Sequence, residues 1–184
     1  MAQRIMILAT DGFEQSELEK PKSNLDDAGY ETVIVSLEDG EIKGWDEKDW
    51  GNSVKVDLTV DEAEESEFDA LLLPGGQMNP DILRMNDKAI KLVGDFCAAG
   101  KPVAAICHAP WLLVEAGVVS GKTVTSWPSV RTDLSNAGAN VVDQEVAIDG
   151  NLITSRNPDD IPAFSKALIS ALEDQQKNSL NEAA

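Results

Sequence analysis

The sequence is poor in several kinds of residue, and each shortage excludes a class of protein. Two cysteines, Cys97 and Cys107, are too few for a disulfide framework, so we expect a reducing compartment, the cytoplasm. No apolar run approaches the roughly 18 to 20 residues that a membrane span requires. Basic residues number 15 against 33 acidic ones, and the net charge of −18 argues against binding to nucleic acid or to an anionic membrane surface.

Histidine is the scarcest chemical group, because His108 is the only one in 184 residues. One histidine and one adjacent cysteine do not supply the three or four ligands of a zinc site, so we expect no metal, and we predict chemistry without a cofactor. His108 follows Cys107 within residues 101–110. Residues 103–106 are apolar and predict a buried strand, and a helix carrying residues 111–114 is predicted directly after the turn. A thiol at the tip of a strand, before a helix N-terminus, is held in surroundings that favour thiolate.

The rest of the chain alternates between strand and helix patterns, with no repeat and no linker. Strands are predicted at residues 4–9, 31–36, 70–74 and 122–125, helices at 14–28, 87–99, 129–137 and from about 160, and a hairpin around Asp149 and Gly150. We expect Pro21 to bend or interrupt the first helix, and Cys97 to be a packed core thiol. The pattern predicts a single three-layer α/β domain at residues 1–174, around a mostly parallel sheet, and a polar, frayed tail at residues 175–184.

Ligands of open α/β sheets bind at the carboxyl ends of the strands, where the segments 10–14 and 75–81 should meet the turn at Cys107. Cys107 is the candidate nucleophile, and His108 is its candidate base or imidazolium partner. We expect Glu14 beside the Cys107 sulfur, protonated and therefore with a raised pKa.

The paired glycines Gly75 and Gly76 allow a ligand to approach the backbone closely. The N–H groups of Gly76 and His108 are candidate donors to an oxyanion. Trp45 and Trp127 are candidate cavity-lining residues. For Trp45 a subunit contact or ordinary anchoring of a loop is an equally good interpretation.

Four motifs together resemble the ThiJ/PfpI superfamily, in its intracellular-protease-like branch, over residues 4 to about 172. They are Ala-Ile-Cys-His-Ala-Pro at 105–110, Leu-Pro-Gly-Gly at 73–76, Asp-Gly-Phe-Glu at 11–14 and Thr-Ser-Trp-Pro at 125–128. The resemblance implies a flavodoxin-like three-layer α/β/α sandwich, related to class I glutamine amidotransferases, with Cys107 at a nucleophile elbow. It also implies a homodimer or hexamer in which a neighbouring subunit supplies the acid of a catalytic triad. Asp81 stands where the archetypal protease has glutamate, in a loop about one residue longer, which bears on peptidase activity more than on the reactivity of Cys107.

Three functions fit these residues. The leading hypothesis is a cysteine-dependent stress-response enzyme of the PfpI type, a protease or hydrolase in which Cys107 attacks a carbonyl and His108 moves protons with help from Asp81. The alternative is glyoxalase- or deglycase-like handling of reactive aldehydes such as methylglyoxal, with Glu14 as the proton-transfer base. A third is a non-catalytic chaperone or oxidation sensor that uses the same thiol. The acidic excess favours solubility or a field that steers cationic substrates, and no sequence feature localises such a field.

Overall fold

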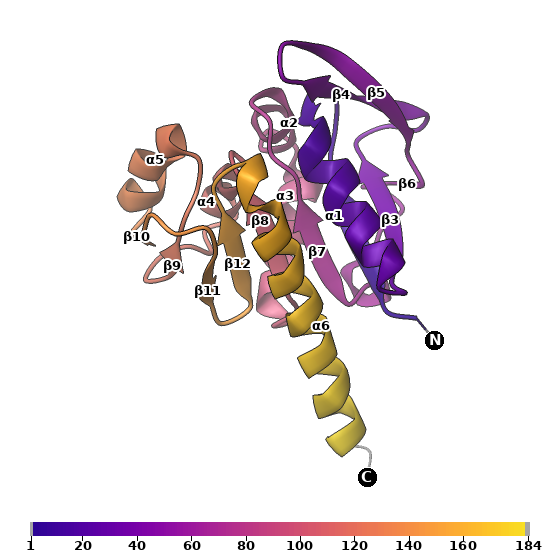
Figure 1. Ribbon diagram of the computed structural model, residues 1–184, viewed down its shortest axis with the longest axis vertical. Coiled ribbons are helices and arrows are strands. Elements are labelled where there is room, and N and C mark those ends of the chain that lie inside the picture. The colour runs from indigo at the N-terminus through magenta and orange to yellow at the C-terminus, as the bar shows by residue number, and fades with distance from the viewer. Residues whose placement is uncertain (1, 183–184) are drawn as a thin grey trace.

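The computed structural model describes residues 2–182, which form a seven-strand sheet between two layers of helices (Figure 1). The strands of this sheet are β1 (Arg4–Leu8), β3 (Glu31–Ser36), β6 (Leu58–Thr59), β7 (Ala70–Leu73), β8 (Val103–Ile106), β11 (Ala147–Asp149) and β12 (Leu152–Ser155). Their order is β11-β12-β8-β7-β1-β3-β6, and only the β11–β12 pair is antiparallel. The predicted flavodoxin-like sandwich is confirmed, and so is the hairpin at the sheet's edge.

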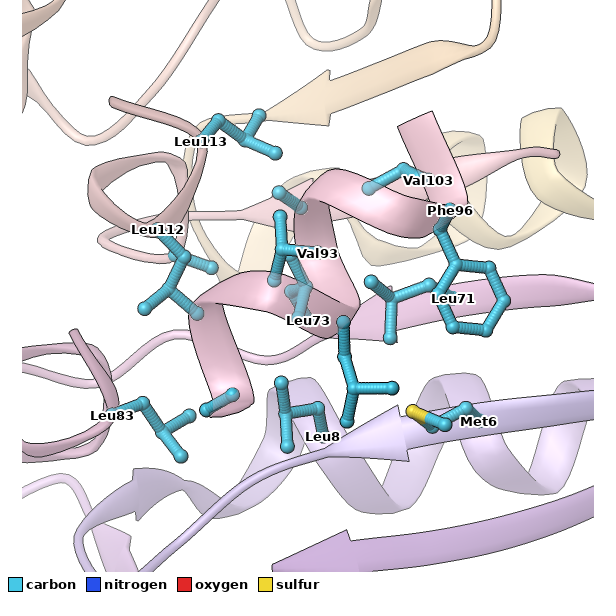
Figure 2. Close-up of a cluster of buried hydrophobic side chains, with 14 of the residues drawn as sticks. Met6, Leu8, Leu71, Leu73, Leu83, Val93, Phe96, Val103, Leu112 and Leu113 are labelled. Carbon is cyan, nitrogen blue, oxygen red and sulfur yellow. The ribbon is translucent and has the colours of Figure 1, made fainter. Parts of the chain in front are cut away.

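The helices divide between the two faces of the sheet. They are α1 (Gln15–Asp27), α2 (Met78–Leu83), α3 (Asp87–Ala98), α4 (Pro110–Glu115), α5 (Arg131–Asn136) and α6 (Ile161–Glu182), with short 3-10 turns at Glu65–Glu67, Pro128–Val130 and Pro158–Asp160. Alternate residues of a strand point to opposite faces, so β1 sends Ile5 and Ile7 to the α1/α6 side and Met6 and Leu8 to the other. Figure 2 shows the second cluster, in which Met6 and Leu8 lie near Leu71 and Phe96. Burial on both faces explains why these strands are continuous apolar runs.

A small second sheet lies beside the carboxyl end of β1 and brings a distant segment to it. The hairpin of β4 (Glu41–Asp46) and β5 (Asp49–Lys55) pairs with β2 (Phe13–Glu14), in the order β2-β4-β5. The register places Glu14 opposite Trp45. A Cβ at Gly44 would lie 3.0 Å from the Phe13 ring, so the close pairing of β2 and β4 leaves little room for a side chain at this position. The strands β9 (Thr123–Val124) and β10 (Asn140–Val141) form a separate parallel pair.

Two details differ from the sequence-based expectation. Helix α1 is continuous through Pro21, whose buried ring lies on the same inner face as Leu18 and Leu25, so packing offsets the hydrogen bond that proline cannot donate. Helix α6 continues to Glu182, so the predicted frayed tail is helical as far as that residue, and residues 183–184 lie outside the described part. Gln175, Gln176, Lys177 and Leu180 of this tail are residue types with a high intrinsic helix propensity. Within residues 2–182, no helix is long and apolar enough to cross a membrane.

Candidate active site

Cys107 lies at a sharp turn between β8 and α4, with a backbone φ of 65°. A non-glycine residue rarely adopts this left-handed conformation, and it persists only where its surroundings enforce it. Two backbone hydrogen bonds do so here: Cys107 N–H donates to the Ser155 carbonyl at 3.0 Å, and Trp127 N–H donates to the Cys107 carbonyl at 2.9 Å. The turn therefore fixes the direction of the thiol at the carboxyl edge of the sheet.

The carboxyl group of Glu17, from the first turn of α1, is the acid that interacts with the Cys107 sulfur. Glu17 is fully buried, and its Oε2 accepts a hydrogen bond from Gly75 N–H at 3.0 Å. Its Oε1 has no nitrogen or oxygen partner within the described residues. Burial raises the pKa of Glu17 to about 8, and the negative charge of Glu14 contributes in the same direction. Glu17 therefore holds a proton near neutral pH.

The pKa of Cys107 reflects two opposing sets of neighbours. Burial raises it most, the Glu17 carboxyl raises it further, and the backbone N–H groups of Gly76 and His108 lower it. While Glu17 is protonated its charge is absent, and its O–H can donate to a thiolate instead. The two groups thus titrate as a pair, in which one proton can reside on oxygen or on sulfur.

The expectation that Glu14 lies beside this sulfur is wrong. Glu14 is the residue before α1, and its carboxylate accepts a hydrogen bond from Ser16 Oγ at 3.1 Å. Residues three apart on a helix share a face, so Glu14 and Glu17 lie on the same side of α1. The sequence-based prediction chose the correct side of the helix but the acid that precedes the correct one by one turn. A signal was present: Glu17 falls beside Leu18 and at a spacing of four from Pro21, on the buried stripe of the helix.

His108 contacts the nucleophile but has no acid partner among residues 2–182. Its Nδ1 lies 3.2 Å from the Cys107 sulfur, and its Nε2 lies 3.4 Å from Ser129 Oγ. The ring stacks on Trp127, and burial lowers the pKa of His108, so the imidazole is neutral near neutral pH. Among residues 2–182, no carboxylate forms a hydrogen bond with it. Asp81 is exposed in the first turn of α2 and makes no such contact.

Cys107 opens into a cavity of about 610 Å³. Its lining residues are Gly12, Glu14, Glu17, Trp45, Glu47, Gly76, Gln77, Met78, Cys107, His108, Trp127 and Pro158. Trp45 and Trp127 both belong to this lining, whereas Trp50 packs edge-on against Trp45, with ring centroids 5.6 Å apart. In the described part of the chain, no three His, Cys, Asp or Glu side chains gather as they would around a metal ion.

Asn79 holds the glycine loop in place, and sequence reasoning missed it. It is fully buried, its Oδ1 accepts from Thr10 N–H at 2.8 Å, and its Nδ2 donates to the carbonyls of Pro74 at 2.8 Å and Gly75 at 3.1 Å. It thereby ties the end of β1 to the loop that carries Gly76. A Cβ on Gly76 would lie 2.5 Å from the Gly12 carbonyl oxygen, so the loop has no space for a side chain there.

The chain matches the model of the DJ-1/PfpI family over residues 3–171. "Deglycase PfpI" of Pyrococcus furiosus is 43% identical over 170 residues, which are 92% of this chain and 99% of that protein. YraA of Bacillus subtilis, whose name provisionally calls it a cysteine protease, is 41% identical, over 94% of this chain and all of that one. "General stress protein 18" of the same organism is 42% identical, over 94% and 99% of the two chains.

Solved structures agree with these sequence matches. A two-domain protein from Anabaena variabilis, with DJ-1/ThiJ/PfpI-like and ferritin-like domains, superimposes with a TM-score of 0.89 at 38% identity, covering 93% of this chain and 48% of that one. DJ-1beta of Drosophila melanogaster superimposes with a TM-score of 0.83 at 29% identity, covering 98% of each chain.

Proposed function

The chain belongs to the DJ-1/PfpI family, and from this premise we propose that it is a cysteine-dependent stress-response enzyme that removes aldehyde adducts, as the name deglycase states for several relatives. One observation carries the proposal. The pair of Cys107 with Glu17 is complete within one chain, whereas the pair of Cys107 with His108 has, in the described part of the chain, no contact with the acid that a hydrolytic triad requires. A thiol beside a protonated carboxyl is suited to add to an aldehyde carbon and to move protons around it.

The first step on an amine adduct of methylglyoxal would replace nitrogen by sulfur. Cys107 attacks the carbon that carries the hydroxyl and the amine, the carbon–nitrogen bond breaks, and the amine leaves with a proton. Glu17 is placed to transfer protons during this exchange because it contacts the sulfur and holds a proton near neutral pH. The product is a free amine and a hemithioacetal on Cys107.

The hemithioacetal then rearranges without any external oxidant. Glu17, deprotonated once its proton has passed to the departing amine, removes the proton from the carbon bonded to sulfur and returns it to the neighbouring carbonyl carbon, while the hydroxyl proton moves to that carbonyl's oxygen, which gives a lactoyl thioester. The N–H groups of Gly76 and His108, which point at the sulfur, are candidate donors to the oxygen that gains charge. Water cleaves the thioester and releases lactate and the Cys107 thiol, so one water is consumed for each adduct removed.

The decisive experiment is lactate release from a methylglyoxal-modified arginine derivative, followed beside lactate release from free methylglyoxal. We expect turnover by the wild type, a loss of at least ~100-fold in Cys107→Ala, and activity close to wild type in the matched variant Cys97→Ser. Equal, slow lactate release by the wild type and Cys107→Ala would overturn the proposal. The parallel rates with free methylglyoxal show whether the enzyme acts on the adduct or only on the aldehyde it releases.

Peptide hydrolysis is the second candidate, favoured by the 3.2 Å contact between His108 Nδ1 and the Cys107 sulfur. It needs an acid on His108, for which Asp81 of a second copy of the chain is our candidate. Cleavage of a peptide by the wild type but not by Cys107→Ala, without lactate release, would favour it over the deglycase. If neither reaction depends on Cys107, the oxidation-sensor hypothesis takes precedence, and peroxide should oxidise Cys107 before Cys97.

A further inference from the structure

We propose that the cavity above Cys107 selects positively charged carbonyl substrates over anionic ones, and that Glu14 and Glu47 make this selection. The inference rests on the proposed function for the reaction, but the charge preference itself belongs to the cavity and can be measured without turnover. It localises, at one site, the cation-steering field that the acidic composition allows.

The cavity carries three carboxyl groups and no basic side chain among its described lining. Glu14 and Glu17 come from the start of α1, and Glu47 comes from the turn between β4 and β5. Burial raises the pKa of Glu14 most, and the charges of Asp46 and Glu47 raise it further, so these acids lie close enough to repel one another. The only imidazole in the cavity is neutral, because burial lowers the pKa of His108.

The walls of the cavity supply a further observation, independent of the acidic cluster. Glu17 lines the cavity at its buried end, but its carboxyl interacts with the Cys107 sulfur and holds a proton near neutral pH, so the charge available to a ligand is that of Glu14 and Glu47. Trp45 and Trp127 enter the lining from two separate segments, and an indole face attracts a cation within about 6 Å of its centroid. Together they form a cavity with acidic and aromatic walls that ends at the nucleophile.

Two lysines on the same hairpin as Glu47, Lys43 and Lys48, are exposed and lie outside the cavity lining. The Lys43 ammonium lies 6.0 Å from the Trp50 ring centroid. Glu47 is exposed, so solvent and salt screen it more than they screen Glu14. Two partly screened carboxylates that line the cavity should favour a monovalent cation over a monovalent anion at Cys107 by a factor on the order of ten.

Charged methanethiosulfonates test this directly, because they modify a thiol in one step that needs no substrate. In a Cys97→Ser background, we would measure the rate constants for Cys107 with the trimethylammonium-ethyl and sulfonatoethyl reagents. Each is divided by its rate with free 2-mercaptoethanol. We expect a cation-to-anion ratio on the order of ten or more at low salt, decreasing as salt is added. A ratio near one would overturn the proposal.

A pair of double variants separates the cavity from the overall charge. Glu14→Gln/Glu47→Gln and Asp39→Asn/Glu41→Gln each remove two negative charges, but the second pair lies in exposed positions outside the cavity lining. We expect the ratio to approach one in the first variant and to stay near the wild-type value in the second. An equal decrease in both would assign the effect to net charge and overturn the proposal.

The rates with the thiol reagents test the charge selection independently of the proposed reaction. A high ratio without lactate release would reject the deglycase assignment and leave the charge selection in place, because the thiol reagents report on the cavity alone. Lactate release from a cationic arginine adduct, together with a cation-to-anion ratio near one, would support the deglycase assignment and reject the charge selection. The two proposals therefore fail separately.

Discussion

The carboxyl of Glu17 and the thiol of Cys107 meet at the buried end of the cavity, although they lie 90 positions apart in the sequence (107 minus 17). Gly75 N–H fixes one oxygen of Glu17 at 3.0 Å, and the other oxygen lacks a nitrogen or oxygen partner in the described residues. Near neutral pH the pair carries no charge, because burial raises the pKa of both groups. Stability and reactivity of the protein should therefore both depend on this one contact.

We predict that Glu17→Gln stabilises the protein at pH 8 but hardly at pH 4.5. The pKa of Glu17 is raised from 4.5 to about 8, so between these values the unfolded chain has released the proton while the folded chain keeps it. The unfolded state then binds fewer protons, and stability falls as pH rises, by up to about 4 to 5 kcal/mol across the window. Glutamine keeps the hydrogen bond from Gly75 without titrating.

Chemical denaturation of both proteins at the two pH values measures this difference. Comparing the two pH values cancels any packing change that the substitution makes. A stability difference that is the same at both would show that Glu17 does not hold its proton in the folded state.

We predict that iodoacetamide modifies Cys107 before Cys97, with a rate that rises as the pH passes about 8, where Glu17 titrates. The first proton lost belongs to the pair, and part of that loss is thiolate. Burial raises the pKa of Cys97 to about 11 although the Lys122 charge lowers it, and no carboxyl or backbone N–H group of the described residues contributes to it, so Cys97 lacks a partner that exchanges a proton with it near pH 8. Glu17→Gln should lose the rise near pH 8. Mass spectrometry of the alkylated peptides gives both rates, and earlier labelling of Cys97 would contradict the assignment of the reactive thiol.

The sheet could be predicted from sequence because its strands are buried on both faces. The continuous apolar runs of β1, β7 and β8 are typical of strands that are covered on both faces. Because helices alternate with these strands along the chain, the sheet is expected to be parallel. The turn at Cys107 could be predicted because the apolar strand pattern of β8 is followed directly by a helical pattern of apolar residues. These features are local, and a single stretch of chain encodes each.

The partners of Cys107 were harder to predict because they depend on distances between segments. Glu14 and Glu17 lie on one face of α1, and only the depth of the helix against the sheet decides which carboxyl meets the sulfur. Asn79 has no chemical motif, since its role consists of three hydrogen bonds to loops that come together only in the fold. The hairpin that carries Trp45 and Glu47 reaches the cavity through its pairing with β2, a non-local contact.

We predict that Asp81→Asn changes the alkylation rate of Cys107 by less than about twofold, because Asp81 is exposed and does not contact His108 within one chain. Peptide hydrolysis behaves differently if a second copy supplies this acid. It should then decrease in the variant, and in the wild type it should decrease on dilution below the concentration at which the oligomer dissociates. Unchanged hydrolysis in Asp81→Asn would remove Asp81 from the mechanism.

We predict that Asn79→Ala slows catalysis more than its stability loss explains. The substitution leaves the Thr10 N–H and the carbonyls of Pro74 and Gly75 without their buried partner, at a cost of about 2 to 4 kcal/mol. Because Asn79 ties the Gly76 loop to the end of β1, the N–H group that points at the sulfur loses its fixed position. Asn86→Ala is the matched control: Asn86 caps α3 through Lys88 N–H and Ala89 N–H, and its removal costs about 0.5 to 2 kcal/mol outside the cavity.

The two asparagine variants should therefore separate in kinetics after correction for folded fraction. In Asn79→Ala we expect kcat and the alkylation rate of Cys107 to fall together while KM changes little, since the loop acts on the reacting sulfur rather than on substrate affinity. In Asn86→Ala we expect neither rate to change at temperatures where the protein is folded. A purely structural role for Asn79 would instead leave both rates at the wild-type value once unfolded protein is accounted for, because a loosened loop acts on chemistry only if its N–H group takes part in it.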